Sequence, residues 1–574
     1  MAEPIGEITI VGGGTAGWMA AVFLITRLNN RPERPPVRVT LIESPNVPTV
    51  GVGEATVPGM RELLKQLGIS EARFMAHCNA SFKLGVRFVN WDKTPEGGPG
   101  CYDHPFDGLG TAIRGVNPAY AYHRFGRGGG LANLGDALSP CTRLIDEKRG
   151  PKTAEQGDYD YAVGYAYHLD AGLFAGLLRQ VAVERGVLHV LDDVDDLQYD
   201  ARGHISALVL RERGPRPVEL VVDCTGFKSL ILQQALGEPF ESFQPYLFND
   251  KALAVQIPHQ DVSQLEPCTR STALGAGWVW RVPLYSRIGT GYVFSSQFRS
   301  DQEAIDEFLQ HLGPEGEGAE PRVIPMRIGR AQRTWVKNCV AVGLSGGFIE
   351  PLESTAIFII EAALRWLVSN LPDKDFDPAV AERYNGLMRG VYEEVRDFIA
   401  LHYQTSNRRD TAYWQAVQSD LEVPDSLQAK LERWRSHLPA EADFEQTYLF
   451  GFWSYLIVLF GKHFYEEARF PEAEALEPQD WQSFAAWVDE QKQGLAGQLP
   501  GHFDLLNQIR QRGRPEPLPE APRAAPAGLP LGGQAAPSVP LPGQSFGVQI
   551  SWKQPRPEAP PPAEVFQPEE GNLL

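Results

Sequence analysis

The sequence predicts an α/β protein with a Rossmann-like core, a mixed second sheet, a helical C-terminal region and a disordered, Pro-rich tail. Three observations predict the core, the helices and the tail. Segments rich in branched residues run repeatedly into glycine turns, apolar residues recur at helical spacing after these turns, and 15 of the 46 prolines fall in residues 514–574. We divide the chain into a core at 1–370, a mainly helical region at 371–513 that packs on the core, and the tail at 514–574.

Composition narrows the possible partners. The 574 residues carry 53 Lys+Arg against 72 Asp+Glu, a formal net charge of −19. Such a surface repels phosphate backbones and anionic lipid headgroups, so we expect neither nucleic acid nor a membrane as a partner. The six cysteines have no paired spacing, and together with the histidines they fit no zinc pattern. We therefore expect reduced thiols, a cytoplasmic protein and no metal site.

The first predicted strand, residues 7–11, runs directly into GGGTAG and an apolar helix. Gly12, Gly14 and Gly17 satisfy G-x-G-x-x-G at this junction, where glycines allow the tight turn and the close approach of a pyrophosphate. The second predicted strand, residues 37–43, ends in an acid suited to ribose hydroxyls. These elements predict a dinucleotide site.

The residues expected to bind the dinucleotide at this first turn are Gly12, Gly14, Thr15, Ala16, Gly17 and Glu43. Two later strands also end in glycine turns, at 223–226 and at 340–347, and Asp170 is placed to cap a further helix. Three separated glycine turns suit a long cofactor. These segments resemble the two-domain flavoprotein oxidoreductases of the hydroxybenzoate hydroxylase type, and the resemblance implies FAD.

Four further motifs make the sequence similar to flavin-dependent halogenases of the tryptophan-halogenase family. They are GVGEATVPG at 51–59, FKLGVRFVNW at 82–91, GWVWRVP at 277–283 and GGFIEPLEST at 346–355. The third matches the family's W-x-W-x-I-P with Val282 in place of isoleucine. On this resemblance Glu54, Leu344 and Ile357 join the residues expected at the FAD.

Lys83 has two readings. Residues 82–91 alternate apolar and polar side chains, which predicts one strand with Lys83 and Arg87 on its polar face. On that pattern alone a strand lysine is a solvated charge. The resemblance instead places Lys83 at the family's essential lysine, a buried amine of lowered pKa that holds hypohalous acid as a haloamine or through a hydrogen bond. The sequence leaves both species open.

Trp278 and Trp280 stand two residues apart in a predicted strand, so their side chains project to one side. They are either an aromatic part of the core or, as the resemblance implies, the barrier between flavin and substrate past which the halogenating agent reaches Lys83.

Ser354 precedes an apolar-periodic run, which predicts an N-cap and a helix over 355–371. Free amides at a helix start bind anions, and the resemblance places halide beside Thr355 and Ala356. The family often has glycine where this chain has Ala356, so the choice between chloride and bromide stays open. Ser354 is also a candidate for orienting groups in the site.

Glu353 matches the family's catalytic glutamate. The alternative is an acid that merely stabilises the start of a helix. In the family role it polarises the halogenating species with Lys83, or it takes the proton from the cationic ring intermediate.

Three aromatic side chains are candidate substrate contacts. His104 and Phe106 fall where the family has such contacts, and Trp453, in the apolar helix predicted at 449–461, is placed to close the pocket. Core packing explains that apolar run equally well.

Together the motifs predict an FADH2-dependent halogenase that chlorinates or brominates an electron-rich aromatic ring, an indole or tryptophan, with O2 and halide as reactants. A separate flavin reductase supplies FADH2 by diffusion, because no second glycine-rich site suits NAD(P)H. No amino-acid clamp is recognisable at 407–461, and a homodimer stays open. Two alternatives remain: a single-component flavin monooxygenase and a non-catalytic FAD-binding protein.

Overall fold

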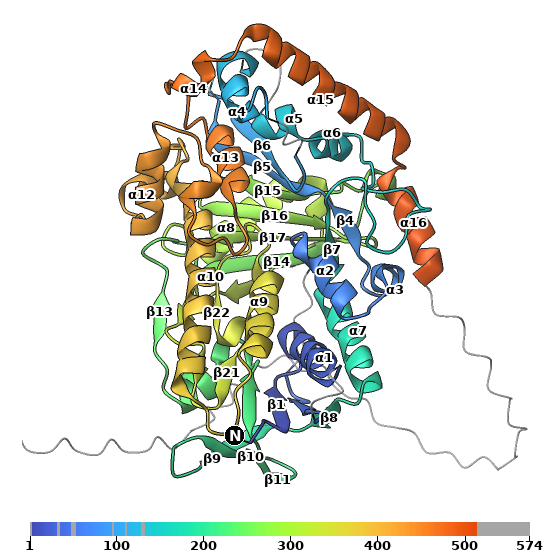
Figure 1. Ribbon diagram of the computed structural model, residues 1–574, viewed down its shortest axis with the longest axis vertical. Coiled ribbons are helices and arrows are strands. Elements are labelled where there is room, and N and C mark those ends of the chain that lie inside the picture. The colour runs from blue at the N-terminus through green and yellow to red at the C-terminus, as the bar shows by residue number, and fades with distance from the viewer. Residues whose placement is uncertain are drawn as a thin grey trace, which may run out of the picture. The chain divides into compact units, whose positions relative to one another are not determined.

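The structure is a computed structural model (Figure 1). It describes residues 3–30, 35–47, 53–94, 97–108, 112–127 and 133–513, all within one compact unit, Met1–Ala524. The predicted tail at 514–574 lies outside these residues. Within the described ranges, no helix combines the length and apolar character that crossing a membrane requires. All six cysteines are unpaired.

The first large sheet is the Rossmann-like core that the sequence predicts. Its six strands lie in the order β20-β21-β12-β1-β2-β8, and all neighbours are parallel except β20 and β21. The strands are β1 (Glu7–Val11), β2 (Arg38–Glu43), β8 (Leu188–Leu191), β12 (Leu220–Asp223), β20 (Trp335–Val336) and β21 (Cys339–Ala341). Helix α1 (Thr15–Asn29) packs against α7 (Ala171–Glu184) and α9 (Ala356–Ser369) beside this sheet (Figure 1).

The second large sheet is mixed, as predicted, with seven strands in the order β18-β14-β17-β16-β15-β5-β6. Only β15 and β5 run parallel. The strands are β5 (Gly85–Lys93), β6 (Pro99–Pro105), β14 (Lys251–Ile257), β15 (Thr269–Ala273), β16 (Gly277–Pro283), β17 (Ile288–Phe294) and β18 (Arg322–Pro325). A three-stranded sheet of β3 (Gly53–Ala55), β7 (Ala166–Asp170) and β4 (Ser81–Lys83) provides the segments around Lys83.

Two smaller sheets complete the β structure: β9 (Val194–Tyr199), β10 (Ile205–Leu210) and β11 (Gly214–Pro217), and β13 (Phe240–Ser242), β19 (Gly329–Ala331) and β22 (Gly347–Phe348). The remaining helices before α9 are α2 (Gly59–Gln66), α3 (Glu71–His77), α4 (Pro118–Ala121), α5 (Leu134–Leu138), α6 (Cys141–Asp146) and α8 (Asp301–Leu312).

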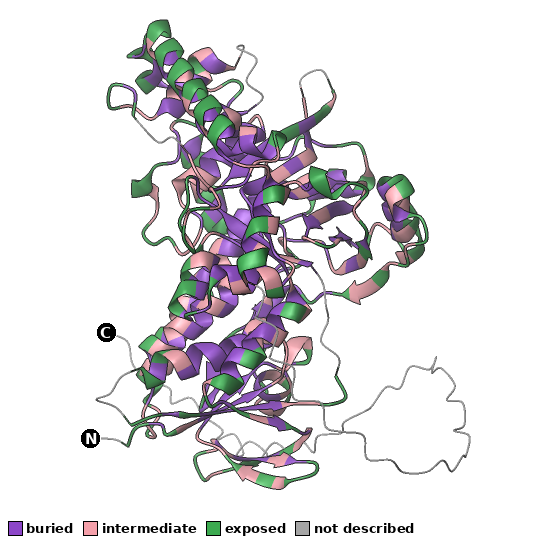
Figure 2. Cartoon of the chain, turned by 90° about the vertical axis from the view of Figure 1, so that its right-hand side faces the viewer, coloured by how far each residue is buried: buried purple, intermediate pink, exposed green. Residues whose placement is uncertain are grey.

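The chain after α9 is mainly helical. It holds α10 (Pro378–Gln404), α11 (Ala412–Ser419), α12 (Asp425–Trp434), α13 (Phe452–Gly461), α14 (Pro471–Glu474), α15 (Pro478–Gln498) and α16 (His502–Gly513). Helix α10 packs against α9, and α13 packs against β6. Buried residues fill the middle of the described unit, whereas the outer faces of the helices are exposed (Figure 2).

Two predictions of local structure are wrong. Residues 82–91 form two strands, β4 and β5, because the chain leaves the sheet at Leu84, whose N–H bonds to the carbonyl of Pro267. Helix α9 begins at Ala356, and Ser354 is not its N-cap. Ser354 has φ of 63°, a left-handed conformation, and its hydroxyl accepts a hydrogen bond from Lys83 instead. Tertiary contacts override the local pattern at both places.

Candidate active site

The glycine-rich turn fits the pyrophosphate of a dinucleotide. Gly12 has φ of 118°, and a Cβ there would lie 2.2 Å from the carbonyl oxygen of Cys224. A Cβ on Gly17 would lie 1.8 Å from the Gly12 carbonyl oxygen, so this glycine lets α1 pack on β1. A Cβ on Gly14 would meet nothing within 4 Å. The open space is therefore at Gly14, before the first N–H groups of α1, at Thr15 and Ala16.

The acid at the end of β2 lies against this turn. A Cβ on Gly13 would be 2.2 Å from the carboxyl carbon of Glu43, so only glycine leaves room for that side chain. Oε2 of Glu43 lies 2.8 Å from Nε2 of His189, a β8 residue that the sequence did not single out. Glu43 is thus positioned for ribose hydroxyls, and these residues fit FAD.

The other residues expected at the FAD lie at different depths. Leu344 is 38% exposed, a high value for leucine, and its neighbour Gly343 sits so close to α1 that a Cβ would be 2.7 Å from the Cβ of Ala16. Ile357, in the first turn of α9, is buried. Glu54 in β3 is partly buried, and burial raises its pKa to about 7. Leu344 therefore presents apolar surface beside the turn, and Glu54 can be neutral near pH 7.

Lys83 is completely buried at the end of β4. Its Nζ donates hydrogen bonds to the Thr56 carbonyl at 3.0 Å and to the Ser354 hydroxyl at 2.9 Å, and it lies 5.0 Å from the centre of the Phe106 ring. No described carboxylate lies within ion-pair distance of it. Burial lowers the pKa of Lys83 to about 7, although Glu353 acts in the opposite direction. The expectation of a solvated lysine is wrong: this amine is enclosed, and its neutral form is accessible near neutral pH.

Two buried histidines hold β4 in place. The N–H of Phe82 donates to Nε2 of His502 at 3.1 Å, and Nδ1 of His502 donates to the Leu265 carbonyl at 3.0 Å. Burial lowers the pKa of His502 to about 4, so this ring is neutral at pH 7. His168 lies 3.1 Å from the hydroxyl of Ser81, and burial lowers its pKa well below the ordinary value. Neither histidine adds a positive charge beside Lys83.

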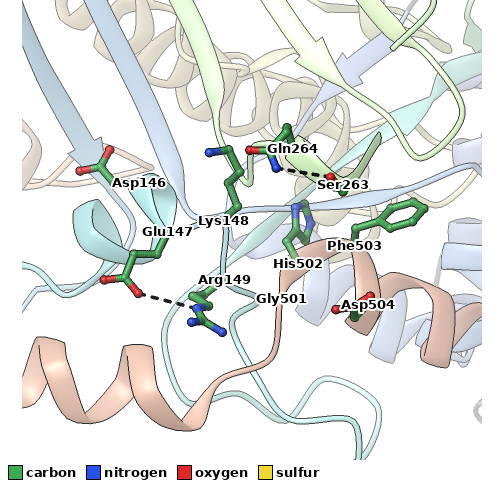
Figure 3. Close-up of a pocket in the computed structure, with 10 residues that line it drawn as sticks. All are labelled: Asp146, Glu147, Lys148, Arg149, Ser263, Gln264, Gly501, His502, Phe503 and Asp504. Carbon is green, nitrogen blue, oxygen red and sulfur yellow. Dashed lines mark hydrogen bonds and ion pairs between the residues drawn. The ribbon is translucent and has the colours of Figure 1, made fainter. Parts of the chain in front are cut away.

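A surface pocket of about 430 Å³ lies on the outer side of His502, lined by charged residues of α6 and the loop after it and by the start of α16 (Figure 3). Neither Lys83 nor Glu353 lines it, so this pocket is separate from the buried cluster. Its relation to the site is through His502, which supports the strand that carries Lys83.

Glu353 is buried and is held by two histidines. Its Oε1 lies 2.9 Å from Nδ1 of His104 and 3.2 Å from Nε2 of His402. Burial raises the pKa of Glu353, but His104 and His402 outweigh that effect and bring it to about 2. His104 is itself buried, with its Nε2 3.1 Å from the hydroxyl of Ser454. Both ring nitrogens of His104 are therefore engaged, and it contacts Glu353 directly.

The start of α9 offers free donors next to this cluster. The N–H groups of Thr355, Ala356 and Ile357 make no hydrogen bond to a described residue. The hydroxyl of Thr355 is enclosed and also lacks a partner among the described residues. Such donors at the start of a 14-residue helix suit a small anion.

The two tryptophans of β16 lie together, with ring centres 6.3 Å apart and planes at 61°. Trp278 is 1% exposed, and its indole N–H donates to Oε2 of Glu350 at 3.3 Å. Trp280 is partly buried and packs against a small apolar cluster of Ala55, Val282 and Leu284, and Ala55 is one residue before the carbonyl that binds Lys83. The pair therefore stands beside the segment that links β3 to Lys83.

One face of α10 lines the opposite side of the site, and the sequence analysis missed it. Glu394, Phe398 and His402 are spaced by four residues. The carboxylate of Glu394 accepts three backbone N–H bonds, from Tyr448, Leu449 and Phe450, at 2.7 to 2.9 Å. Phe398 stacks on the ring of Phe450 at 3.8 Å. The spacing of these residues by four along the chain predicts that they share one face of a helix, although many helices show such spacing.

Trp453 follows this anchored loop in the first turn of α13 and is half-buried. A Cβ on Gly108 would lie 2.7 Å from its ring, so Trp453 covers the chain just after Phe106. His77, Cys78, Cys101 and His104 do not come together, and within the described ranges no group of three or more His, Cys, Asp or Glu side chains is arranged to hold a metal.

A Rossmann-like cradle that fits FAD, next to a buried amine and a buried carboxylate, defines a flavin-dependent oxidoreductase with an enclosed reaction site. The sequence profile described as tryptophan halogenase matches residues 7–478. The chain is 37% identical to the tryptophan 6-halogenase SttH of Streptomyces toxytricini, over 88% of this chain and 98% of that protein. It is 37% identical to the tryptophan 7-halogenase RebH of Lentzea aerocolonigenes, over 90% of this chain and all of that protein.

Among solved structures, the tryptophan halogenase of Shewanella frigidimarina superimposes with a TM-score of 0.82 at 34% identity, covering 89% of this chain and 99% of that one. The chain belongs to the tryptophan halogenase family. It is therefore a flavin-dependent halogenase, an enzyme that uses FADH2, O2 and halide, works with a separate flavin reductase and acts on an aromatic substrate.

Proposed function

We propose that Lys83 holds the halogenating species and that Glu353 assists transfer of the halogen to an indole ring. The observation that carries this proposal is the enclosed amine of Lys83, whose hydrogen-bond partners among the described residues are a carbonyl and a hydroxyl and which lies over an aromatic ring. Bound reduced FAD supplies, with O2 and halide, the hypohalous acid. The amine orients this reagent in a site that keeps it from other targets.

The start of α9 is the proposed halide site. The free N–H groups of Thr355 and Ala356 and the unpartnered hydroxyl of Thr355 support it, because each is a donor that an anion would satisfy. The tryptophans at 278 and 280 are the proposed barrier between flavin and substrate. Their bulk and burial support this role, because two packed indoles keep the organic ring from the flavin.

The substrate side is assigned to Phe106, Trp453 and the face of α10. We propose that the region 371–513 covers this side of the core, because α10 brings His402 to Glu353 and its Glu394 anchors the loop before Trp453. Aromatic walls around a carboxylate suit a flat, electron-rich ring. Free indole and tryptophan both meet this requirement, and SttH and RebH are named for tryptophan. A cytoplasmic setting and a homodimer complete the proposal.

The test uses the full chain with FAD, NADH, a flavin reductase and a panel of indoles that includes indole and L-tryptophan, with chloride or bromide. Mass spectrometry should show products with the halogen isotope pattern. Lys83→Met removes the amine but nearly keeps the side-chain volume, so the halogenated product should disappear while FAD binding, followed by flavin fluorescence, is retained. A mass gain of one oxygen that does not depend on halide would instead support a monooxygenase.

A further inference from the structure

The tautomer of His402 is fixed by the structure. His402 lies in α10, is completely buried, and its Nδ1 is 2.9 Å from the carbonyl oxygen of Phe398. A carbonyl oxygen only accepts hydrogen bonds, so Nδ1 carries a proton. A neutral His402 would therefore have a bare lone pair on Nε2.

That second nitrogen faces a carboxylate. Nε2 of His402 is 3.2 Å from Oε1 of Glu353 and makes no well-aligned hydrogen bond to a described residue. A bare nitrogen lone pair this close to an ionised carboxylate oxygen is unfavourable even without good alignment, and burial strengthens the repulsion. A proton on Nε2 of His402 would turn this repulsion into an attraction.

The two oxygens of Glu353 are not equivalent. Oε1 has both histidines as neighbours, with His104 on β6 at 2.9 Å and His402 on α10 at 3.2 Å. Oε2 makes no hydrogen bond to a described residue, and it is not among the fully enclosed atoms that lack a partner. Oε2 is thus the oxygen of Glu353 that has no partner among the described residues.

We propose that His402 carries the proton on Nε2 and, together with His104, ties Oε1 of Glu353, so that Oε2 is the atom that removes the ring proton. His402 is then a positioning residue for Glu353, and this inference rests on the proposed role of Glu353. In the step it serves, the C–H bond at the halogenated carbon breaks, its electron pair restores the aromatic ring, and the proton goes to Oε2.

The surroundings of His402 act on its pKa in opposite directions. Burial lowers the pKa of His402 below its ordinary value, and Glu353 opposes this shift by favouring a proton on Nε2. Lys462, at the end of α13, is the other charged group that acts on His402, and it disfavours the cation. Nζ of Lys462 donates to the Trp91 carbonyl at 2.9 Å and has no contact with Glu353.

Two variants separate positioning from packing. His402→Asn keeps an amide donor near the Nδ1 position, for the Phe398 carbonyl, but removes the group that faces Glu353. His402→Gln places an amide near the Nε2 position and can donate to Oε1. Each is assayed with ordinary and ring-deuterated indole, and circular dichroism melting checks the fold.

We expect His402→Asn to lower kcat about 10-fold or more with KM changed less than about twofold, and His402→Gln to recover part of that loss. In the Asn variant, proton removal should become slow enough for ring deuteration to lower the rate about twofold or more, while the wild type shows no such effect. A merely structural role would not create this isotope effect. Equal kcat in the Asn variant and the wild type, or a loss without an isotope effect, would overturn the proposal.

Glu353→Gln distinguishes failure of the proposed role of His402 from failure of the proposed role of Glu353. If Glu353→Gln keeps full activity, the proposed role of Glu353 fails. If Glu353→Gln loses activity and His402→Asn does not, only the role of His402 fails. Nitrogen NMR of histidine-labelled protein gives an independent check: His402 should carry protons on both nitrogens over the pH range in which the enzyme is active, and a bare Nε2 there would overturn the inference.

Discussion

We expect the hydroxyl of Ser354 to favour the protonated form of Lys83. It is one of two hydrogen-bond acceptors of the buried Nζ, at 2.9 Å, and the Thr56 carbonyl is the other, at 3.0 Å. Ser354→Ala removes this acceptor without adding backbone strain, because a left-handed φ of 63° is equally unfavourable for alanine and for serine. A hydrogen bond donated by an ammonium contributes about 1 kcal/mol more than one donated by a neutral amine. Losing the Ser354 hydroxyl therefore destabilises the protonated form of Lys83 more than the neutral form.

A difference of about 1 kcal/mol lowers the pKa of Lys83 by about 0.7, because one pKa unit equals 1.36 kcal/mol. The wild-type pKa is about 7. The midpoint of the pH profile of kcat/KM should therefore move to roughly 6.3 in Ser354→Ala. The profile rises with pH if the neutral amine is the reactive form and falls if the ammonium is, but the midpoint moves downward in both cases.

The assay measures initial rates of halogenated product between pH 5.5 and 8.5, with the flavin reductase in excess and halide constant. Ser454→Ala is the matched control, because this hydroxyl contacts His104 at 3.1 Å and not Lys83. Its midpoint should stay at the wild-type value. A midpoint in Ser354→Ala that stays constant or moves upward, or an equal movement in Ser454→Ala, would refute the reasoning.

Three further outcomes are expected. Gly13→Ala should weaken FAD binding about 10-fold or more by flavin fluorescence titration, because its Cβ would displace the Glu43 carboxylate at 2.2 Å, and unchanged affinity would contradict the cradle. Glu394→Ala should raise KM for the indole about 10-fold with a smaller change in kcat, because the three backbone N–H groups at 448–450 lose their charged acceptor. An unchanged KM would show that the loop before Trp453 does not help to bind the substrate. In the FAD-free protein, Glu54→Gln should raise Tm by about 1–2 °C at pH 8 and leave it unchanged at pH 4. Burial raises the pKa of Glu54 from 4.5 to about 7, so the folded protein loses stability as pH rises from 4.5 to 7 and Glu54 ionises. An equal Tm of the variant and the wild type at pH 8 would contradict this expectation.

The sequence by itself determined the first glycine turn and the strands around it. Gly12, Gly14 and Gly17 sit at a strand-to-helix junction whose geometry is local, so eleven residues of pattern suffice to predict it. The cap at Asp170, which accepts N–H bonds from Gly172 and Leu173, was predicted from a pattern of the same short range.

Only the tertiary structure decided the environment of the reactive groups. Lys83 looked like a solvated strand lysine, and its burial comes from Ser354, 271 residues away, and from β4 being held by His502, 420 residues from Phe82. Glu353 likewise depends on His402, which no local motif marks. Periodicity reports which face of an element is apolar, whereas desolvation and proton sharing depend on which distant side chains close over that face.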